Sequence, residues 1–579
     1  MDELHALLDE LDKVKERTSE REISRRVNSV ARGDLRVEAV GEVLAFSFCE
    51  NYADKRGSWG TYFGPMMTWM AEDGTTHESP SLNEVNEGVI NYWLMRSTVS
   101  ANPIMKARYL GLVWDLSEAA VHRKPDHEVA VAYVHALIEA VDHDACKIPT
   151  EGIEKVSRAY RVAAALNNVE MIGKSIASAI ALEDRVARDD LPGLWGFSFK
   201  LFVLGKCRHL SQAQQHKLLT DLESRLDRVV KCRDPWASEL AGIPLASYYR
   251  RQKMEAEATR VVDVVGRCFE DTCEGLDAIQ ASSRLQHVHS IYLAYNMSEG
   301  VERVSKRIAE VGPAVVESMR VVSHSVEISK KELDEYFDDL TAGGLDSALH
   351  RIAWQFIPKR DQVERQLLDL ARQHPVSFLF ARTLQDHRGR PVATIGDIES
   401  DLDGHVLHHL TQCLHISAPL LRGALERASL LYGLTEDGLL SHILRSPLFE
   451  EARSSIIRRG VAAFLAQDYL PTVHILVPQA EAAVRRLVDL SGGASLKRNR
   501  VGGFQLKNLD ELLREPAVDR CLGSDMCLYF RMLLTDQRGW NLRNDLCHGI
   551  SPSNSFNSAS ADRVMHVMLC LSVVSAEPA

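Results

Sequence analysis

Apolar residues recur at helical spacing through most of residues 88–372, and this pattern restricts the region to a helical architecture. The amphipathic stretches are about 12–20 residues long. Short breaks at 190–193, 233–235 and 343–344 separate them. Helices that follow one another at such intervals predict an irregular helical array or an α-solenoid, although no repeat consensus is clean. Clear examples are Asn102–Trp114, Glu128–Val141, Ile153–Leu166, Ser211–Val230 and Met254–Glu270.

The regions on either side of the array predict further domains. Residues 1–87 open with an amphipathic run and continue into a stretch broken by glycine, which indicates a helical segment with an irregular loop. Residues 88–372 form the expected array, and residues 398–579 are again helical. We therefore expect an all-α protein with four parts: 1–87, 88–372, a connector at 373–397, and 398–579.

The connector departs from the helical pattern. Residues 375–381 are rich in aromatic and β-branched side chains, 386–390 contain turn-forming residues, and 391–395 are apolar again. This order predicts two short strands around a turn, a β-hairpin near 376–396. We place the boundary between the N-terminal array and the C-terminal half there.

Composition is that of an ordinary globular protein. Apolar residues make up 45% of the 579 and charged residues 26%. No run of 18 apolar residues predicts a membrane span, and the acidic start lacks a secretory signal pattern. The eleven cysteines are scattered without a CxxC pair, which is typical of reduced thiols. We therefore expect a cytoplasmic protein.

The most informative motif lies near the C-terminus and contains Arg543, Asn544 and His548. A guanidinium is a permanent cation whose planar fork matches phosphate oxygens. An imidazole can give or take a proton near neutral pH. Together these groups can handle a phosphodiester. Asn541 can cap a short helix over 540–549, and Gly549 marks its end.

The five-residue spacing between Arg543 and His548 constrains this motif. Five residues on an α-helix correspond to about 140° of rotation, so the two side chains do not naturally share one face. Either the last turn is distorted, or a two-fold dimer supplies the same segment twice.

The run from Leu533 to Asn544, followed by His548 and Gly549, resembles the signature of a family of uncharacterised proteins named for an RNxxxHG motif. That family is similar to the HEPN superfamily of all-helical domains, in which an R-x(4–6)-H motif marks metal-independent endoribonucleases. The resemblance extends upstream through 473–481, 485–487 and 492–493, and more loosely to 386–389. It covers roughly residues 440–579.

The resemblance implies a HEPN-like helical bundle that cleaves RNA through attack of the ribose 2′-OH, without a metal or other cofactor. His548 would be the general base or acid, Arg543 would stabilise charge on the phosphoryl oxygens, and Asn544 would orient the phosphate or the His548 ring. It also implies a homodimer and a role as a toxin or antiviral defence effector. Arg538 and Asn541 are secondary candidates for substrate binding.

The motif lies in a basic part of an acidic chain. The net charge is −12, yet residues 451–550 carry 14 Lys and Arg against 11 Asp and Glu. The densest point predicts a basic, Gly-rich surface loop that could hold an RNA backbone or simply be solvated. Its candidate substrate-binding residues are Lys497, Arg498, Arg500 and Lys507.

Other interpretations remain open. The Arg-to-His spacing also occurs at Arg284/His289 and at Arg382/His387. The C-terminal domain could be an inactive HEPN-like dimerisation scaffold, with the N-terminal helices binding a protein partner or activator. The histidines between 405 and 415 could hold a metal if a second cluster joined them. A phosphate-binding loop at Gly173-Lys174-Ser175 is rejected, because position 168 is Asn rather than the required Gly and a helix, not a strand, is expected before it.

Overall fold

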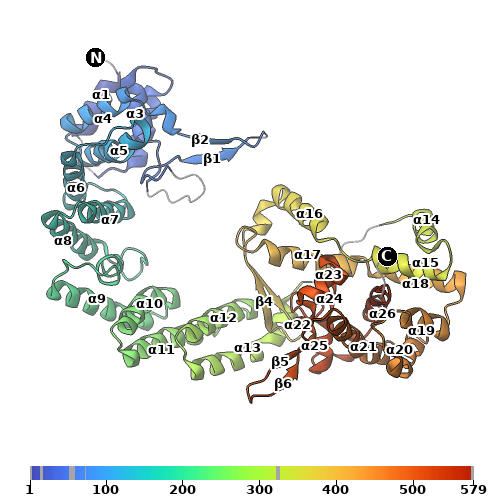
Figure 1. Cartoon of the computed structure of the whole chain (residues 1–579). Helices are drawn as coiled ribbons and strands as arrows, with labels where there is room; N and C mark the ends of the chain where they lie inside the picture. The colour runs from blue at the N-terminus through green and yellow to red at the C-terminus, as the bar shows by residue number, and fades with distance from the viewer. Residues whose placement is uncertain (1–2, 14–16, 51–58, 72, 321–326, 576–579) are drawn as a thin grey trace. The chain divides into compact units, whose positions relative to one another are not determined.

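The computed structural model describes residues 3–13, 17–50, 59–71, 73–320 and 327–575. It divides into two compact units, Met1–Val311 (unit 1) and Gly312–Ala579 (unit 2). The described residues are mainly helical, with three separate two-stranded hairpins (Figure 1). The expected all-α class is therefore confirmed.

Unit 1 is a succession of helices with one hairpin near its start, β1 paired antiparallel with β2. Its elements are α1 (Glu3–Lys13), α2 (Glu20–Ala31), α3 (Val37–Ala45), β1 (Met67–Met70), β2 (Thr76–Ser79), η1 (Leu82–Glu84), α4 (Glu87–Val99), α5 (Pro103–Val121), α6 (His127–Asp142), α7 (Pro149–Ala165), α8 (Val169–Val186), the π-helix η2 (Phe199–Leu204), α9 (Gln212–Lys231), α10 (Pro235–Arg251), α11 (Glu255–Asp271), α12 (Ala278–Ala294) and α13 (Ser298–Ser318), which runs into unit 2.

Some short connections between helices in unit 1 contain a residue with a left-handed backbone conformation, followed by a residue whose side chain caps the start of the next helix. After α7, Asn167 adopts φ 53°, and the next residue, Asn168, accepts a hydrogen bond from Met171 N–H to start α8. Asparagine tolerates the left-handed region and caps helices well. Such connections bring each helix back against the previous one, so α4 to α8 and α9 to α12 pack in sequence order.

Unit 1 has two adjoining apolar cores. The first joins α1–α5, and the second runs from α5 to α13. Helix α5 contributes Tyr109 to the first core and Leu110 to the second. The N-terminal segment expected at 1–87 thus shares its core with α4 and α5.

Unit 2 is a helical bundle with two hairpins, β3–β4 and β5–β6. Its elements are α14 (Lys330–Thr341), α15 (Leu345–Gln355), α16 (Arg360–Gln373), η3 (Pro375–Phe378), β3 (Arg382–Gln385), β4 (Pro391–Ile395), α17 (Leu402–Ile416), α18 (Ala418–Tyr432), α19 (Glu436–Leu444), η4 (Glu451–Arg453), α20 (Ser454–Leu465), α21 (Tyr469–Leu490), β5 (Leu496–Arg498), β6 (Phe504–Leu506), α22 (Leu509–Leu513), α23 (Pro516–Leu522), α24 (Ser524–Leu534), α25 (Leu542–Cys547), η5 (Ser553–Ser555) and α26 (Ser558–Ser572).

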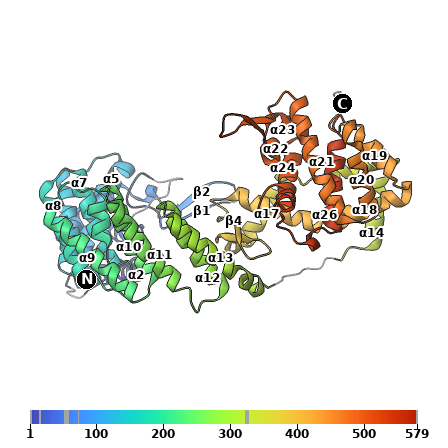
Figure 2. The ribbon, with the colours of Figure 1, turned by 90° about the horizontal axis from the view of Figure 1, so that it is seen from below.

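Helix α26 forms the centre of unit 2. Every residue from 560 to 571 is buried, as expected for a helix enclosed on all sides. It packs against α15, α18, α19 and α21. The last three of these helices lie around it in Figure 2. Because α14 and α15 belong to this core, the division falls at 311/312, N-terminal to the boundary expected near 372.

The connector hairpin is present but begins later than the sequence indicates. Residues 375–378 form a 3₁₀ turn, with Pro375 in its first turn, and the strands are β3 and β4. Asp386 fixes the turn by accepting hydrogen bonds from the N–H groups of Arg388 and Arg390, both at 2.9 Å. The turn was therefore predicted correctly, and the first strand was placed too early.

Candidate active site around Arg543 and His548

The RNxxxHG segment forms the short helix α25. Asn541 occupies the N-cap position with φ 50°, but its side chain caps no backbone N–H, so the predicted capping role is wrong. Its amide instead donates to Asp545 Oδ1 at 2.8 Å. Gly549 ends the helix with φ 62°, as expected. The Asn541 side chain therefore bonds to the side chains of Asp545 and Asn544 instead of capping the start of the helix.

Arg543 is partly buried, with 21% of its side chain exposed. Its Nε donates to Glu481 Oε2 of α21 at 2.9 Å, and its Nη1 donates to Asn544 Oδ1 at 3.2 Å. Nη2 has no hydrogen-bond partner among the described residues. The guanidinium is therefore held in one orientation while one of its nitrogen atoms remains free to bind an anion.

Asn544 connects α25 to the segment before it. Its Nδ2 donates to Thr535 O at 3.1 Å and to Asn541 Oδ1 at 2.8 Å. The side-chain amide of Asn544 is thus fully engaged inside the protein, because its Nδ2 donates twice and its Oδ1 accepts from Arg543. It positions Arg543 and the loop rather than presenting a free amide.

His548 lies at the exposed C-terminal end of α25. Its backbone N–H donates to Asn544 O at 2.9 Å. The imidazole makes no hydrogen bond or ion pair with any residue that the structure describes. The structure thus joins Arg543 to Asn544, and leaves the His548 ring unconstrained and open to solvent.

Arg538 stabilises the turn before α25. Its Nη2 lies 2.8 Å from Asp536 Oδ2, and its backbone carbonyl accepts a hydrogen bond from Thr411 of α17 at 3.2 Å. Asp403 lies at the edge of ion-pair distance, 4.0 Å from Nη1. These contacts give Arg538 an architectural role.

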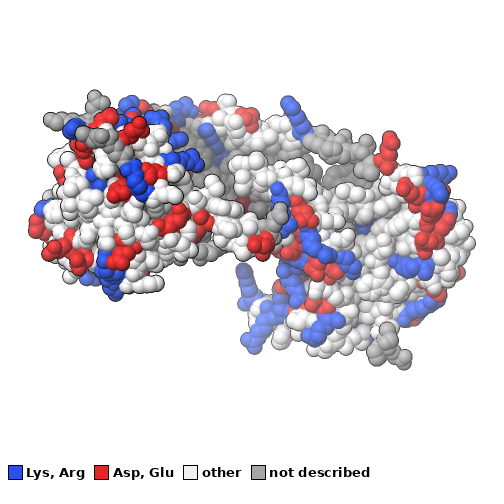
Figure 3. All heavy atoms as spheres, turned by 90° about the horizontal axis from the view of Figure 1, so that it is seen from above, with Lys and Arg blue, Asp and Glu red and all other residues white. Residues whose placement is uncertain are grey.

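The expected basic loop is the β5–β6 hairpin. Lys497 pairs with Glu511 at 2.5 Å, and Lys507 pairs with Glu515 at 2.6 Å. Arg498 and Arg500 are exposed and form no ion pair within the described ranges. Figure 3 shows Lys and Arg side chains projecting there. Of the four predicted cations, two are neutralised and two are available for an anionic partner.

A pair of side chains connects this hairpin to the motif. Arg485 of α21 donates to Lys507 O at 2.9 Å and to Glu481 Oε1 at 3.0 Å. Glu481 then accepts from Arg543 through its other oxygen. The base of the hairpin and the motif arginine therefore lie on either side of one Arg485–Glu481 pair.

The sequence singles out His387 through its spacing from Arg382 but does not predict its effect on the motif helix α25. It lies exposed in the β3–β4 turn, and its charge acts on Asp545 of α25. Burial raises the pKa of Asp545, while the Asn541 hydrogen bond and His387 oppose that rise. A second imidazole is thus near the motif helix. The looser resemblance at 386–389 was the available signal.

The histidines of α17 do not form a joint site. His405 is buried, with Nε2 2.9 Å from Gly396 O, and His409 contacts Gln412 at 3.2 Å. His415 lies against Trp540, with 4.8 Å between ring centroids. In the part of the chain that the structure describes, no three His, Cys, Asp or Glu side chains are grouped to hold a metal.

Comparisons with known proteins assign no family. No family model and no curated protein matches the chain. One solved structure it resembles is a "Circular tandem repeat protein with novel repeat topology and enhanced subunit contact surfaces", at 13% identity over 92% of this chain and 88% of that one. The TM-score of 0.11 is too low to define a shared fold or a function. Among the described helices, none has the length and apolarity to cross a bilayer.

Proposed function

We propose that unit 2 is a metal-independent, HEPN-like endoribonuclease. The observation that supports this best is that α25 carries an immobilised Arg543, with one free nitrogen atom, and ends at the exposed His548. A positioned cation and a titratable ring are the two groups that phosphodiester transesterification requires.

In the proposed reaction the ribose 2′-oxygen attacks the adjacent phosphorus, and a general base takes the 2′-OH proton. The bond from phosphorus to the 5′-oxygen breaks, and a general acid protonates that oxygen. The products are a 2′,3′-cyclic phosphate and a 5′-OH. Arg543 Nη2 would bind the phosphoryl oxygen that gains charge, and His548 would transfer one of the two protons.

The second proton-transfer group has two candidates. A homodimer would supply a second His548 through a two-fold axis, as expected from the motif spacing. His387 is the candidate within one chain, because its charge acts on Asp545 of the motif helix. Loss of cleavage in His387→Ala, with dimerisation unchanged, would assign the role to His387.

Arg498 and Arg500 are the proposed contacts for the RNA backbone, since Lys497 and Lys507 already have carboxylate partners. Phe504, 68% exposed and opposite Arg498 in the hairpin, offers a ring for base stacking. The proposed biology is a cytoplasmic toxin or antiviral defence effector, with unit 1 binding a protein partner or activator.

A second candidate function is an inactive scaffold that dimerises through unit 2. The Arg543–Glu481 pair favours it, because a structural arginine would make the same contact. For such a scaffold, Arg543→Ala would reduce the stability of unit 2 and its dimerisation. Neither wild type nor any variant would cleave RNA.

The test is incubation of the full chain with mixed-sequence labelled RNA in excess EDTA. We expect cleavage by wild type, and a loss of about 100-fold or more in His548→Ala and Arg543→Ala. His289→Ala is the matched control, because Arg284 and His289 have the same spacing in unit 1. Absence of wild-type cleavage, or full activity of His548→Ala, would contradict the proposal.

A further inference from the structure

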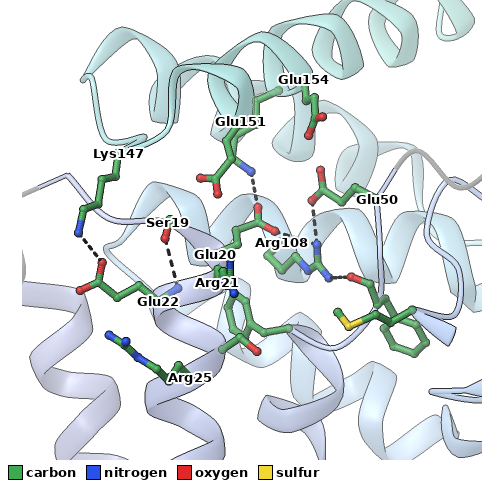
Figure 4. Close-up of a pocket in the computed structure, with 15 residues that line it drawn as sticks. Ser19, Glu20, Arg21, Glu22, Arg25, Glu50, Arg108, Lys147, Glu151 and Glu154 are labelled. Carbon is green, nitrogen blue, oxygen red and sulfur yellow. Dashed lines mark hydrogen bonds and ion pairs between the residues drawn. The ribbon is translucent and has the colours of Figure 1, made fainter. Parts of the chain in front are cut away.

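Unit 1 contains a cavity of about 970 Å³ lined mainly by charged side chains. It lies between the N-terminal turns of α2 and α7, with Arg108 of α5 and the segment after α3 completing the lining (Figure 4). This volume is in the range of small-molecule binding sites. None of the candidate residues of unit 2 takes part in it.

The floor of the cavity is a closed set of opposite charges. Arg108 and Lys155 are both only 3% exposed. Glu20 accepts hydrogen bonds from both, and Glu50 accepts a second one from Arg108 at 2.9 Å. Buried cations require such partners, so these four side chains compensate one another and shape the site.

One wall carries two carboxyl groups that have no cationic partner among the described residues. Glu151 and Glu154 project from α7 and form no ion pair with any described residue (Figure 4). The Glu151 Oε2 atom is buried without a hydrogen-bond partner. Burial, followed by repulsion from Glu20, raises the pKa of Glu151 to about 7. A cationic group bound here would supply the missing partner.

The opposite wall carries uncompensated positive charge. Arg21 and Arg25 lie one turn apart on α2, both exposed, and neither has an ion-pair partner in the described ranges. Lys147, also at the rim, is already paired with Glu22 at 3.0 Å. The wall on α2 therefore favours an anionic group, and two arginines at this spacing suit a carboxylate.

We infer that this cavity binds a zwitterion with a guanidinium or ammonium group at one end and a carboxylate at the other. A basic amino acid, free or at the C-terminus of a peptide, has this chemistry. Its cation lies against Glu151 and Glu154, and its carboxylate against Arg21 and Arg25. The aliphatic stem crosses the apolar part of the lining, which includes Met66.

The experiment titrates the full chain with L-arginine by calorimetry. Citrulline replaces the guanidinium with a neutral group of the same shape, and agmatine lacks the carboxylate. We expect arginine to bind and each analogue to bind at least about tenfold more weakly. A Gly-Gly-Arg peptide and its C-terminal amide distinguish the sources: tighter binding by the free-acid peptide than by arginine assigns the site to a peptide terminus, and weaker binding assigns it to the free amino acid.

Two variants test the walls separately. Glu151→Gln should weaken arginine binding about tenfold, and Arg25→Gln should weaken arginine but leave agmatine unchanged. Glu118→Gln, an exposed substitution on α5, is the matched control. Circular dichroism checks that each variant is folded. Absence of arginine binding up to about 10 mM, equal affinity for citrulline, or an unaffected Glu151→Gln variant would overturn the inference.

Discussion

The two units use buried charge differently. In unit 1, Arg108 and Lys155 are buried beside the carboxylates of Glu20 and Glu50, and this group borders a cavity. In unit 2, the fully buried Arg563 of α26 forms no ion pair among the described residues. The first arrangement leaves charged groups at an accessible surface, and the second leaves none.

Arg563 and its neighbour His566 instead bond to oxygen atoms of distant helices. Arg563 donates to Leu414 O at 2.8 Å, and His566 Nε2 lies 3.1 Å from Ile352 O. These contacts connect α26 to α17 and α15. The cluster around Arg108 in unit 1 thus borders a cavity, whereas Arg563 and His566 in unit 2 connect helices within the bundle that contains α25.

The largest expected effect on stability is at Arg108. Arg108→Met leaves Glu20 and Glu50 without their shared cation, which should cost unit 1 about 3–5 kcal/mol of unfolding free energy. Hydrogen exchange in peptides of α2, α5 and α7 measures this loss within the full chain. Arg123→Met, at an exposed pair with Glu87, should change it by less than about 1 kcal/mol. A similar small change for Arg108→Met would remove the contrast between the units.

The next effect is acid sensitivity of unit 2. Burial, followed by Arg563, lowers the pKa of His566 from 6.5 to about 3. The unfolded chain then binds this proton more readily than the folded chain does. The free energy of unfolding that depends on neutral His566 is therefore fully present above pH 6.5 and is lost as the pH falls toward 3. The loss should reach up to about 4 kcal/mol.

Hydrogen exchange of α26 peptides at several pH values measures that slope. Comparison of wild type with His566→Leu isolates this group from the other titrating side chains, and His350→Leu is the exposed control. His350→Leu should keep the wild-type dependence of stability on pH. If His566→Leu kept it as well, His566 would not be the buried neutral group described.

A smaller effect concerns the free cations of the β5–β6 hairpin. Arg498→Ala with Arg500→Ala should weaken RNA binding by about 1–2 kcal/mol and reduce its salt dependence by about two counterions. Lys497→Ala with Lys507→Ala should change it less, because both lysines are paired. Arg161→Ala with Arg208→Ala, two exposed arginines of unit 1 outside the proposed sites, is the matched control. Fluorescence anisotropy at two salt concentrations distinguishes the three double variants.

The smallest effect is at Glu151, whose pKa of about 7 exceeds its ordinary 4.5. The folded chain holds this proton more tightly than the unfolded chain does. The contribution of Glu151 to the free energy of unfolding is therefore fully present below pH 4.5 and disappears as the pH rises through 7. After allowance for solvent screening, wild type should lose about 1 kcal/mol relative to Glu151→Gln across that window. Parallel pH profiles of the two proteins would contradict the assignment.

Local chemistry made much of the fold predictable. The helix expected over 211–230 is Gln212–Lys231, because Ser211 caps it through Gln214 N–H. The turn at 386–390 was also evident, since Asp386 and Gly389 are residue types that suit a turn. In contrast, the inclusion of α14 and α15 in unit 2 depends on burial against α26, more than 200 residues away for the Ile352–His566 contact.

The candidate site was less predictable for the same reason. The motif named Arg543 and His548, but the Glu481 partner of Arg543 lies 62 residues away in the sequence. The pairing of Lys497 with Glu511 likewise depends on the fold of the hairpin. A count of basic residues predicts a positive region, and only the structure separates its free cations from its neutralised ones.

The most direct test of the central claim is the mass of the cleavage products from wild-type protein in EDTA. The account predicts fragments that end in a 2′,3′-cyclic phosphate, with 5′-OH partners, and no cleavage of the same RNA carrying 2′-O-methyl groups. Fragments with a linear 5′-phosphate, or cleavage of the methylated strand, would show that the 2′-oxygen is not the nucleophile and would contradict the role assigned to Arg543 and His548.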